Sequence, residues 1–266
     1  MEILHLTATQ FLQPMGTGRT HPVLLGAEDA DGNIFEVVVK LRGPEMSAKA
    51  QIAELLAAPL ADLLGIDVPQ AAVVNVPDGF DEIVPPPYAA AVRGSTGADF
   101  GSVHLGTSFT TWAVGRVPVG VQRDQAAAIF AFDLLVQNPD RRAVNPNLWT
   151  RSDRLGVYDH EQAFSFLHLP IIGGPPRPWV MANQPAAFRF MENHIFYPAL
   201  RGGRLDLGPF EAKLGALSNE AIGGLLEPVP AEWRQGHDLC ERTADYLREA
   251  REEKTAFLNF VKHLLR

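Results

Sequence analysis

The middle of the chain passes from a helical pattern to a polar loop and then to two short strands. Apolar residues recur at helical spacing over residues 122–137, and Asn138-Pro139 ends that helix because the residue before a proline is kept out of the α region. The apolar runs 147–150 and 155–158 flank a polar turn and predict a hairpin. This stretch therefore predicts a helix, a loop and a hairpin that follow one another directly.

Three side chains in this stretch have the order and spacing of phosphoryl-transfer groups. Asp140 and Asn145 lie in the loop, and Asp159 follows the second strand of the hairpin. Kinase-like folds use an Asp that accepts the proton of a substrate hydroxyl, and then an Asn and a second Asp that hold Mg²⁺ on the nucleotide phosphates. Carboxylate and amide oxygens are ligands that suit Mg²⁺. The alternative is an ordinary polar loop, because Asp and Asn are frequent in turns.

The N-terminal third predicts a sheet. Strand-like runs cover residues 3–11, 21–25, 34–40, 71–76 and 88–92. The polar, Gly-rich residues after the last run are the expected hinge between two lobes. In kinase-like folds the backbone of the hinge meets the edge of the adenine base, so Ala91, Val92 and Arg93 are expected beside a bound adenine. The glycine-rich segment with Gly16 and Gly18 is shorter than the G-x-G-x-x-G loop of protein kinases, so it is expected to cover the nucleotide phosphates only loosely.

One helix is predicted after the third strand, over residues 47–64, with Ser47 as its N-cap and Gly65 as its stop. Lys40 ends the third strand, and Glu54 lies in the second turn of the helix. We expect these two side chains to form the ion pair with which kinase-like folds bind nucleotide phosphates. The alternatives are a solvated lysine on an edge strand and a solvated glutamate on the helix face.

The chain resembles the HipA-like kinase family, in particular its shorter members with little beyond the kinase core. The segments that carry the resemblance keep the family's order over more than half of the chain: Gly18-Arg19-Thr20-His21-Pro22, Val38-Val39-Lys40, Ala53-Glu54-Leu55, and residues 64–69, 100–102, 132–135, 138–142, 145–148 and 158–160. The resemblance implies an α+β, two-lobed protein-kinase-like fold. The N-lobe, an antiparallel sheet plus one helix, would span residues 1–93, and a mostly helical C-lobe would span residues 94–266.

The same resemblance implies a Ser/Thr-kinase-like enzyme that uses ATP and Mg²⁺. By that resemblance Lys40 contacts phosphate and Asp140 is the catalytic base. Asn145 and Asp159 would be the metal ligands.

The sequence departs from the general protein-kinase pattern at several points. Asn138-Pro139 stands where protein kinases have His-Arg, and Asp159 is followed by His160-Glu161 instead of Phe-Gly. No Ala-Pro-Glu segment follows, so conventional activation-loop regulation is not expected. Glu161 either helps to hold metal or has a structural role, and both alternatives stay open.

Arg141 and Arg142 directly follow the expected base. They either neutralise charge on the transferred phosphoryl group or pair with nearby acids. We expect one of the two arginines to pair with a nearby acid in a structural role, and the sequence does not indicate which one.

Bulk properties fit a cytoplasmic enzyme. The net charge of −8 argues against a nucleic-acid-coating role, which usually shows a basic stripe. The single cysteine, Cys240, excludes an intramolecular disulfide framework and suits a reducing compartment. No apolar run is long enough for a membrane span, and the N-terminal residues do not read as a signal peptide.

The C-terminal part predicts helices over residues 185–199, 209–217, 218–226 and 237–265, after a Pro/Gly loop at 171–178. Three functions stay open. The first is a protein kinase. The second is a small-molecule or lipid kinase, or a nucleotidyl transferase, on the same fold. The third is a nucleotide-binding pseudokinase module.

Overall fold

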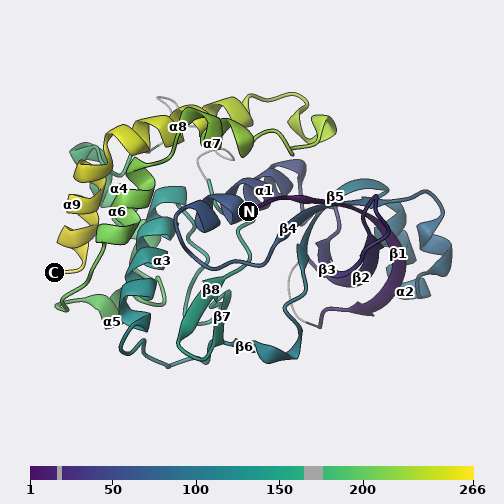
Figure 1. Ribbon diagram of the computed structural model, residues 1–266, viewed down its shortest axis with the longest axis horizontal. Coiled ribbons are helices and arrows are strands. Elements are labelled where there is room, and N and C mark those ends of the chain that lie inside the picture. The colour runs from purple at the N-terminus through teal and green to yellow at the C-terminus, as the bar shows by residue number, and fades with distance from the viewer. Residues whose placement is uncertain (17–19, 165–175) are drawn as a thin grey trace.

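Five strands close into a barrel at one end of the protein, and most helices gather at the other end (Figure 1). The computed structural model describes residues 1–16, 20–164 and 176–266. The barrel strands are β1 (Leu4–Pro14), β2 (Val23–Glu28), β3 (Ile34–Lys40), β4 (Ala71–Val76) and β5 (Gly97–Val103). They are ordered β1-β2-β3-β5-β4, and the parallel pair of β1 with β4 closes the ring. The predicted α+β class is confirmed. The prediction of a purely antiparallel sheet is wrong, because β1 and β4 pair in parallel. This pair closes the ring and gives both strands a second partner.

The fifth strand lies later in the chain than the sequence predicts. Residues 88–92 belong to helix α2 (Pro86–Arg93), and β5 pairs with β3 and β4 in their place. Proline at the start of a helix needs no N–H, and the alanines that follow favour a helix, so this segment does not form a strand. Small residues suit β5, because a Cβ on Gly101 would lie 2.7 Å from Val74 Cγ2. The sheet thus extends beyond the boundary expected at residue 93.

Helix α1 (Ala48–Leu63) lies between the barrel and the helical part (Figure 1). Ser47 Oγ accepts the N–H of Ala50 at 3.3 Å, and Gly65 has a φ of +81°, which confirms the predicted start and end. Buried α1 residues such as Leu55 and Leu56 belong to the core of the helical part, whereas the barrel interior forms a separate core. Although α1 follows a barrel strand in the chain, it is built into the helical part.

The predicted helix, loop and hairpin are confirmed as α3 (Gln122–Val136), β7 (Leu148–Arg151) and β8 (Arg154–Val157), and β6 (Thr110–Thr111) adds a third strand. The remaining helices are α4 (Gln184–Met191), α5 (Tyr197–Leu200), α6 (Gly208–Gly215), α7 (Asn219–Gly224), α8 (Leu239–Glu252) and α9 (Lys254–Leu264). Short 3₁₀ helices span Phe80–Ile83, Gly106–Ser108, Met181–Asn183 and Ala231–Arg234. Within the described ranges, no helix combines the length and the apolarity needed to cross a membrane.

Two predicted helices are each divided in the structure. The helix expected over 185–199 becomes α4 and α5, because the chain between them turns His194 inward to meet Asp133. The helix expected over 237–265 becomes α8 and α9. Residues 251–256 at this division are all at least partly exposed, so no buried packing holds the chain straight there. Most of the Pro/Gly loop expected at 171–178 lies outside the described residues.

Candidate functional site

A cavity of about 820 Å³ lies between the barrel and the helical part. Its wall is formed by the turn after β1, the ends of β3 and β5, part of α1, and the loop between α3 and β7. The predicted site residues that line it are Gly16, Lys40, Glu54, Asp140, Asn145 and Asp159. Gly18 lies outside the described residues. Segments far apart in the sequence therefore bring most of the predicted side chains to one cavity.

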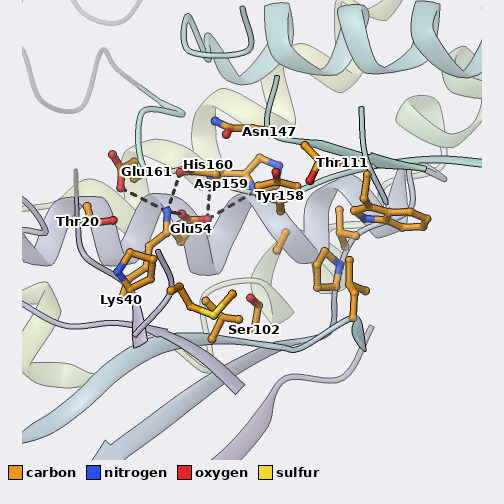
Figure 2. A pocket seen from close by; sticks show the side chains of 18 of the residues that line it. Thr20, Lys40, Glu54, Ser102, Thr111, Asn147, Tyr158, Asp159, His160 and Glu161 are labelled. Atoms are coloured by element: carbon orange, nitrogen blue, oxygen red, sulfur yellow. Dashed lines mark hydrogen bonds and ion pairs between the residues drawn. The ribbon is translucent and has the colours of Figure 1, made fainter. Parts of the chain in front are cut away.

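Lys40, at the end of β3, is surrounded by carboxylates in this cavity (Figure 2). Its ammonium donates to Glu54 Oε1, to Asp159 Oδ1 at 2.6 Å and to Glu161 Oε2 at 3.3 Å. Burial alone would lower the pKa of Lys40, but the three carboxylates outweigh burial and raise that pKa above its ordinary value. Lys40 is therefore charged, and the predicted pair with Glu54 is present.

The Glu54 carboxylate is buried, and both of its oxygens have partners. Oε1 accepts from Lys40, and Oε2 accepts the backbone N–H of His160 at 2.9 Å. Burial acts to raise the pKa of Glu54, yet Lys40 and His160 act against burial and hold the pKa below its ordinary value. Glu54 thereby joins α1 both to β3 and to the segment that follows β8.

Asp159 lies two residues after the end of β8, and its own backbone is left-handed, with a φ of +63°. Residues other than glycine rarely adopt this conformation, and it persists where the surrounding structure enforces it. Here the two residues that follow are also held, His160 by Glu54 and Glu161 by Lys40. The turn after β8 thus brings the Asp159 carboxylate to the Lys40 ammonium.

Asp140, Arg142 and Asn145 form a compact group in the loop between α3 and β7. Asp140 Oδ1 accepts from Arg142 Nη2 at 2.8 Å, and Oδ2 accepts from Asn145 Nδ2 at 2.8 Å. The backbone N–H groups of Arg142 and Asn145 each bond to the carbonyl of the other at 3.0 Å. The Arg142 side chain is 48% exposed, and that of Asp140 is 10% exposed. The loop therefore fixes the carboxylate, and the arginine lies on its open side.

Beneath this loop, Asp133 of α3 lies at the centre of a buried network whose role the sequence did not predict. Its carboxylate accepts from Arg141 Nε at 2.6 Å, from Arg141 Nη2 at 3.1 Å and from His194 Nε2 at 2.9 Å. Arg141 also donates to the carbonyl oxygens of Asn147 and Tyr158, which ties the loop to the hairpin. Arg141 is thus the arginine with the structural pairing that was expected for one of the two.

The charges in this network are fixed by burial and contact. Burial acts to raise the pKa of Asp133, but Arg141 and His194 hold the pKa below its ordinary value. Burial lowers the pKa of His194 despite the contact with Asp133. The ring is therefore neutral with its proton on Nε2, because Nδ1 accepts the N–H of Phe196 at 3.2 Å. An acid within the apolar run of α3 was the available sequence signal for this network.

The structure does not bring Ala91, Val92 and Arg93 to the cavity. They lie in α2, on the outer side of the barrel (Figure 1), where Arg93 pairs with Asp81 at 2.6 Å. After α2 the chain returns to the cavity within β5, where Phe100 and Ser102 line it, so these three residues lie away from the cavity. Residues 103–106 line the cavity instead.

Among the described residues, the oxygens of Glu54, Asp159 and Glu161 lie within 4.8 Å of one another, close enough to share a metal ion. Burial raises the pKa of Glu161 above its ordinary value. Asn145, the other expected ligand, lines the same cavity, and its amide nitrogen donates to Asp140, so its carbonyl oxygen is the atom suited to a cation.

The sequence pattern of one known family, described as HipA-like kinase, matches residues 8–167. The match covers more than half of the chain and includes every charged group of the cavity described above. The chain belongs to the HipA-like kinase family. The resemblance found in the sequence is thereby confirmed, and helices α4 to α9 lie outside the matched range.

This HipA-like kinase is similar to the crystal structure of a Helicobacter pylori proinflammatory kinase, CtkA. The two chains are 11% identical, each is covered to 100%, and the TM-score is 0.54. It is also similar to the open conformation of CtTel1, with 12% identity over 94% of this chain and 12% of that one and a TM-score of 0.38. No curated protein matches the sequence. The likeness to CtkA is one of fold.

Proposed function

We propose that this HipA-like kinase is an ATP- and Mg²⁺-dependent enzyme that transfers the γ-phosphoryl group to a Ser or Thr hydroxyl of a protein. The observation that carries the proposal is that Asp140 lines the same cavity as Lys40 and Asp159. Phosphoryl transfer needs a group that takes the hydroxyl proton, together with positive charge on the phosphates. The loop after α3 offers the first, and the Lys40 side of the cavity offers the second.

We divide the protein into two lobes after Val103 and assign the adenine base to the segment that follows. The N–H groups of Val103 and His104 already bond to the carbonyls of Gln70 and Glu36, at 2.8 Å each. The backbone donors for a base edge would therefore come from Leu105 onward, where the chain lines the cavity.

Asp140 is the base in this proposal. Its oxygens each accept one hydrogen bond, from Arg142 and from Asn145, and a carboxylate oxygen has two lone pairs. Asp140 therefore keeps acceptor capacity for a substrate hydroxyl while both bonds fix its orientation. Arg142, on the exposed side, is suited to neutralise charge on the phosphoryl group in transit.

The oxygens of Asp159, Glu161 and Asn145 are hard ligands of the kind that Mg²⁺ prefers, so the residues present fit this ion. When bound, Mg²⁺ neutralises the charge that develops on the phosphate oxygens. Lys40 supplies a further positive charge, and Glu54 holds its ammonium at the cavity wall.

The binding half of the proposal is tested by thermal-shift titration with ATP, with and without Mg²⁺. The wild type should be stabilised by ATP only when Mg²⁺ is present, and Asp159→Asn should weaken that stabilisation because it removes a ligand charge. Asp153→Asn, the same change at an exposed position in the β7–β8 turn, should behave as wild type. An equal, metal-independent shift in all three proteins would contradict the metal assignment.

The catalytic half is tested with γ-labelled ATP, first with the protein alone and then with a cell extract. Asp140→Ala should lower turnover by roughly 10²–10⁴-fold, the scale of general-base loss, with little change in the ATP-induced thermal shift. A variant that loses stability but keeps its rate per folded molecule would show that Asp140 is structural. ATP binding without any transfer by the wild type would indicate a binding module, and label in a small product would correct the acceptor class.

A further inference from the structure

Gln51 of α1 connects the helix to two barrel strands at the position of Lys40. Its side chain is fully buried, its Nε2 donates to the carbonyl oxygen of Lys40 at 2.8 Å, and its Oε1 accepts the N–H of Phe100. Lys40 and Phe100 are partners across the β3–β5 pair. The amide of Gln51 therefore occupies the end of this strand pair and satisfies one backbone group from each strand.

The chemistry of the site demands a carboxamide. The group that faces the Lys40 carbonyl has to donate, and the group that faces the Phe100 N–H has to accept, so one side chain needs both functions. An ionised carboxylate of the same length only accepts, and an aliphatic side chain does neither. The orientation of the amide is also fixed, because a flipped Gln51 would set donor against donor and acceptor against acceptor.

A second buried group secures the same corner. Asp99 Oδ1 accepts the backbone N–H of Arg42 at 3.0 Å and lies 3.4 Å from Gln51 Nε2, and Asp99 Oδ2 bonds to Ser95 Oγ at 2.6 Å. The two hydrogens of the Gln51 amide are thus directed to Lys40 and to Asp99. This arrangement fixes the chain just after β3 as well as the helix.

Gln51 and Glu54 are three residues apart and therefore share one face of α1. Gln51 holds the carbonyl of Lys40, and Glu54 holds its ammonium. On its other side, α1 packs Leu56 and Leu60 into the core of the helical part. The helix is consequently held from both directions, with Lys40 bonded at its backbone and at its side chain.

We propose that Gln51 is a positioning residue, which keeps the Lys40–Glu54 pair closed by pinning α1 to β3 and β5. Moving α1 away would leave two buried backbone groups without partners, which is costly. The pair is therefore closed in the free protein, and its closure needs no swing of α1. The expected effect on turnover rests on the proposed kinase function, whereas the effect on Lys40 itself does not.

The test is the reactivity of Lys40 towards an amine-acylating reagent, quantified by mass spectrometry on the folded protein. In Gln51→Leu, the labelling rate of Lys40 should rise by about tenfold or more, because the loss of buried hydrogen bonds frees the pair to open. The other four lysines serve as internal references: Lys49, Lys213, Lys254 and Lys262. Turnover of γ-labelled ATP should fall in the same variant.

Gln122→Leu is the matched control. Gln122 is also a buried glutamine on a helix, but it lies in α3, and its Oε1 has no hydrogen-bond partner among the described residues. Its replacement should leave Lys40 labelling and turnover unchanged. If Lys40 labelling rose as much in Gln122→Leu as in Gln51→Leu, the cause would be a general loosening of the protein, and the proposal would be overturned.

Gln51→Glu gives a second, pH-dependent readout and carries the test if Gln51→Leu does not fold. The ionised glutamate keeps an acceptor for Phe100 and loses the donor for Lys40, and protonation restores that donor. The labelling ratio of this variant to wild type should therefore fall as the pH is lowered.

Two results overturn the positioning role: Lys40 labelling equal to wild type in the folded Gln51 variants, or faster labelling with unchanged turnover when the wild type is an active kinase. Faster labelling in the variants, combined with no turnover by the wild type, supports the role of Gln51 and refutes the kinase function instead.

Discussion

Asp133→Asn is expected to destabilise the protein more than any single change at its surface. The Asp133 carboxylate is fully buried and accepts from Arg141 and His194. Removing its charge leaves the guanidinium of Arg141, 0% exposed, without a counter-ion, and breaking a buried pair in this way costs about 3–5 kcal/mol. Because a domain has only about 5–15 kcal/mol of stability, a large share of it would be lost. With an m-value of about 3 kcal/mol per M, the urea midpoint should fall by roughly 1–1.7 M.

Asp67→Asn provides the matched control, because Asp67 also bonds an arginine through two nitrogens. That pair, with Arg154, is exposed: the arginine side chain is 63% and the aspartate 31% accessible. Exposed pairs contribute about 0–1 kcal/mol, so the urea midpoint should move little. Equal midpoint shifts in the two variants, or a shift for Asp133→Asn no larger than that of the surface pair, would refute the reasoning from burial.

The double variant Asp133→Leu with Arg141→Met separates stability from function. Replacing both partners with apolar side chains removes the unpaired charge, so much of the stability should return. Turnover should not return, because the carbonyl oxygens of Asn147 and Tyr158 lose the donors that Arg141 gives them. Urea denaturation and turnover of γ-labelled ATP on the same preparations measure the two effects, and recovery of both would show that Arg141 does not order the loop.

Three further predictions follow from the geometry. Lys40→Arg should turn over γ-labelled ATP more slowly than wild type, because a planar guanidinium cannot replace a compact ammonium among three carboxylates. A wild-type rate in this variant would contradict the prediction. Burial raises the pKa of Asp99 to about 6 against the opposing effect of Ser95, so this group makes the native state less stable as the pH rises from about 4 to about 6. In urea titrations the stability of Asp99→Asn relative to wild type should therefore rise over that interval, by up to about 3 kcal/mol, and stay level above it; a flat difference would exclude the shift. Gly156→Ala should lower the thermal midpoint, because its Cβ would lie 2.0 Å from the Trp149 ring and the ring would have to move, whereas an unchanged midpoint would show that the hairpin adapts freely.

The parts of the site that the sequence predicts are those coded over short distances. Lys40 is recognisable because it ends a β-branched strand, and Glu54 because it lies at a fixed place in a capped helix. Asp140 and Asn145 are recognisable because a helix stop and a hairpin enclose their loop. In each case the local pattern also fixes where the side chain is presented, so the predicted residues meet in one cavity.

The parts that were missed depend on contacts between distant segments. Asp133 and His194 are 61 residues apart, and Gln51 and Phe100 are 49 apart, so no local pattern relates them. The fifth strand was misplaced because its glycines weaken the strand signal, although the packed barrel interior requires a residue without a side chain at Gly101. Tertiary packing decided these positions, and a single sequence does not display it.

The closed barrel has a consequence for how other proteins can engage this end of the molecule. Each of its five described strands has a hydrogen-bonded neighbour on both sides, since β1 and β4 pair with each other. Many recognition domains capture peptides by letting them add a strand to a free sheet edge, where main-chain groups wait unpaired. None of the described barrel strands is a free edge along its whole length, so a partner that docks on the barrel has to rely mainly on side chains. The exposed side chains of these strands would then determine which partner binds, and they could change without altering the fold.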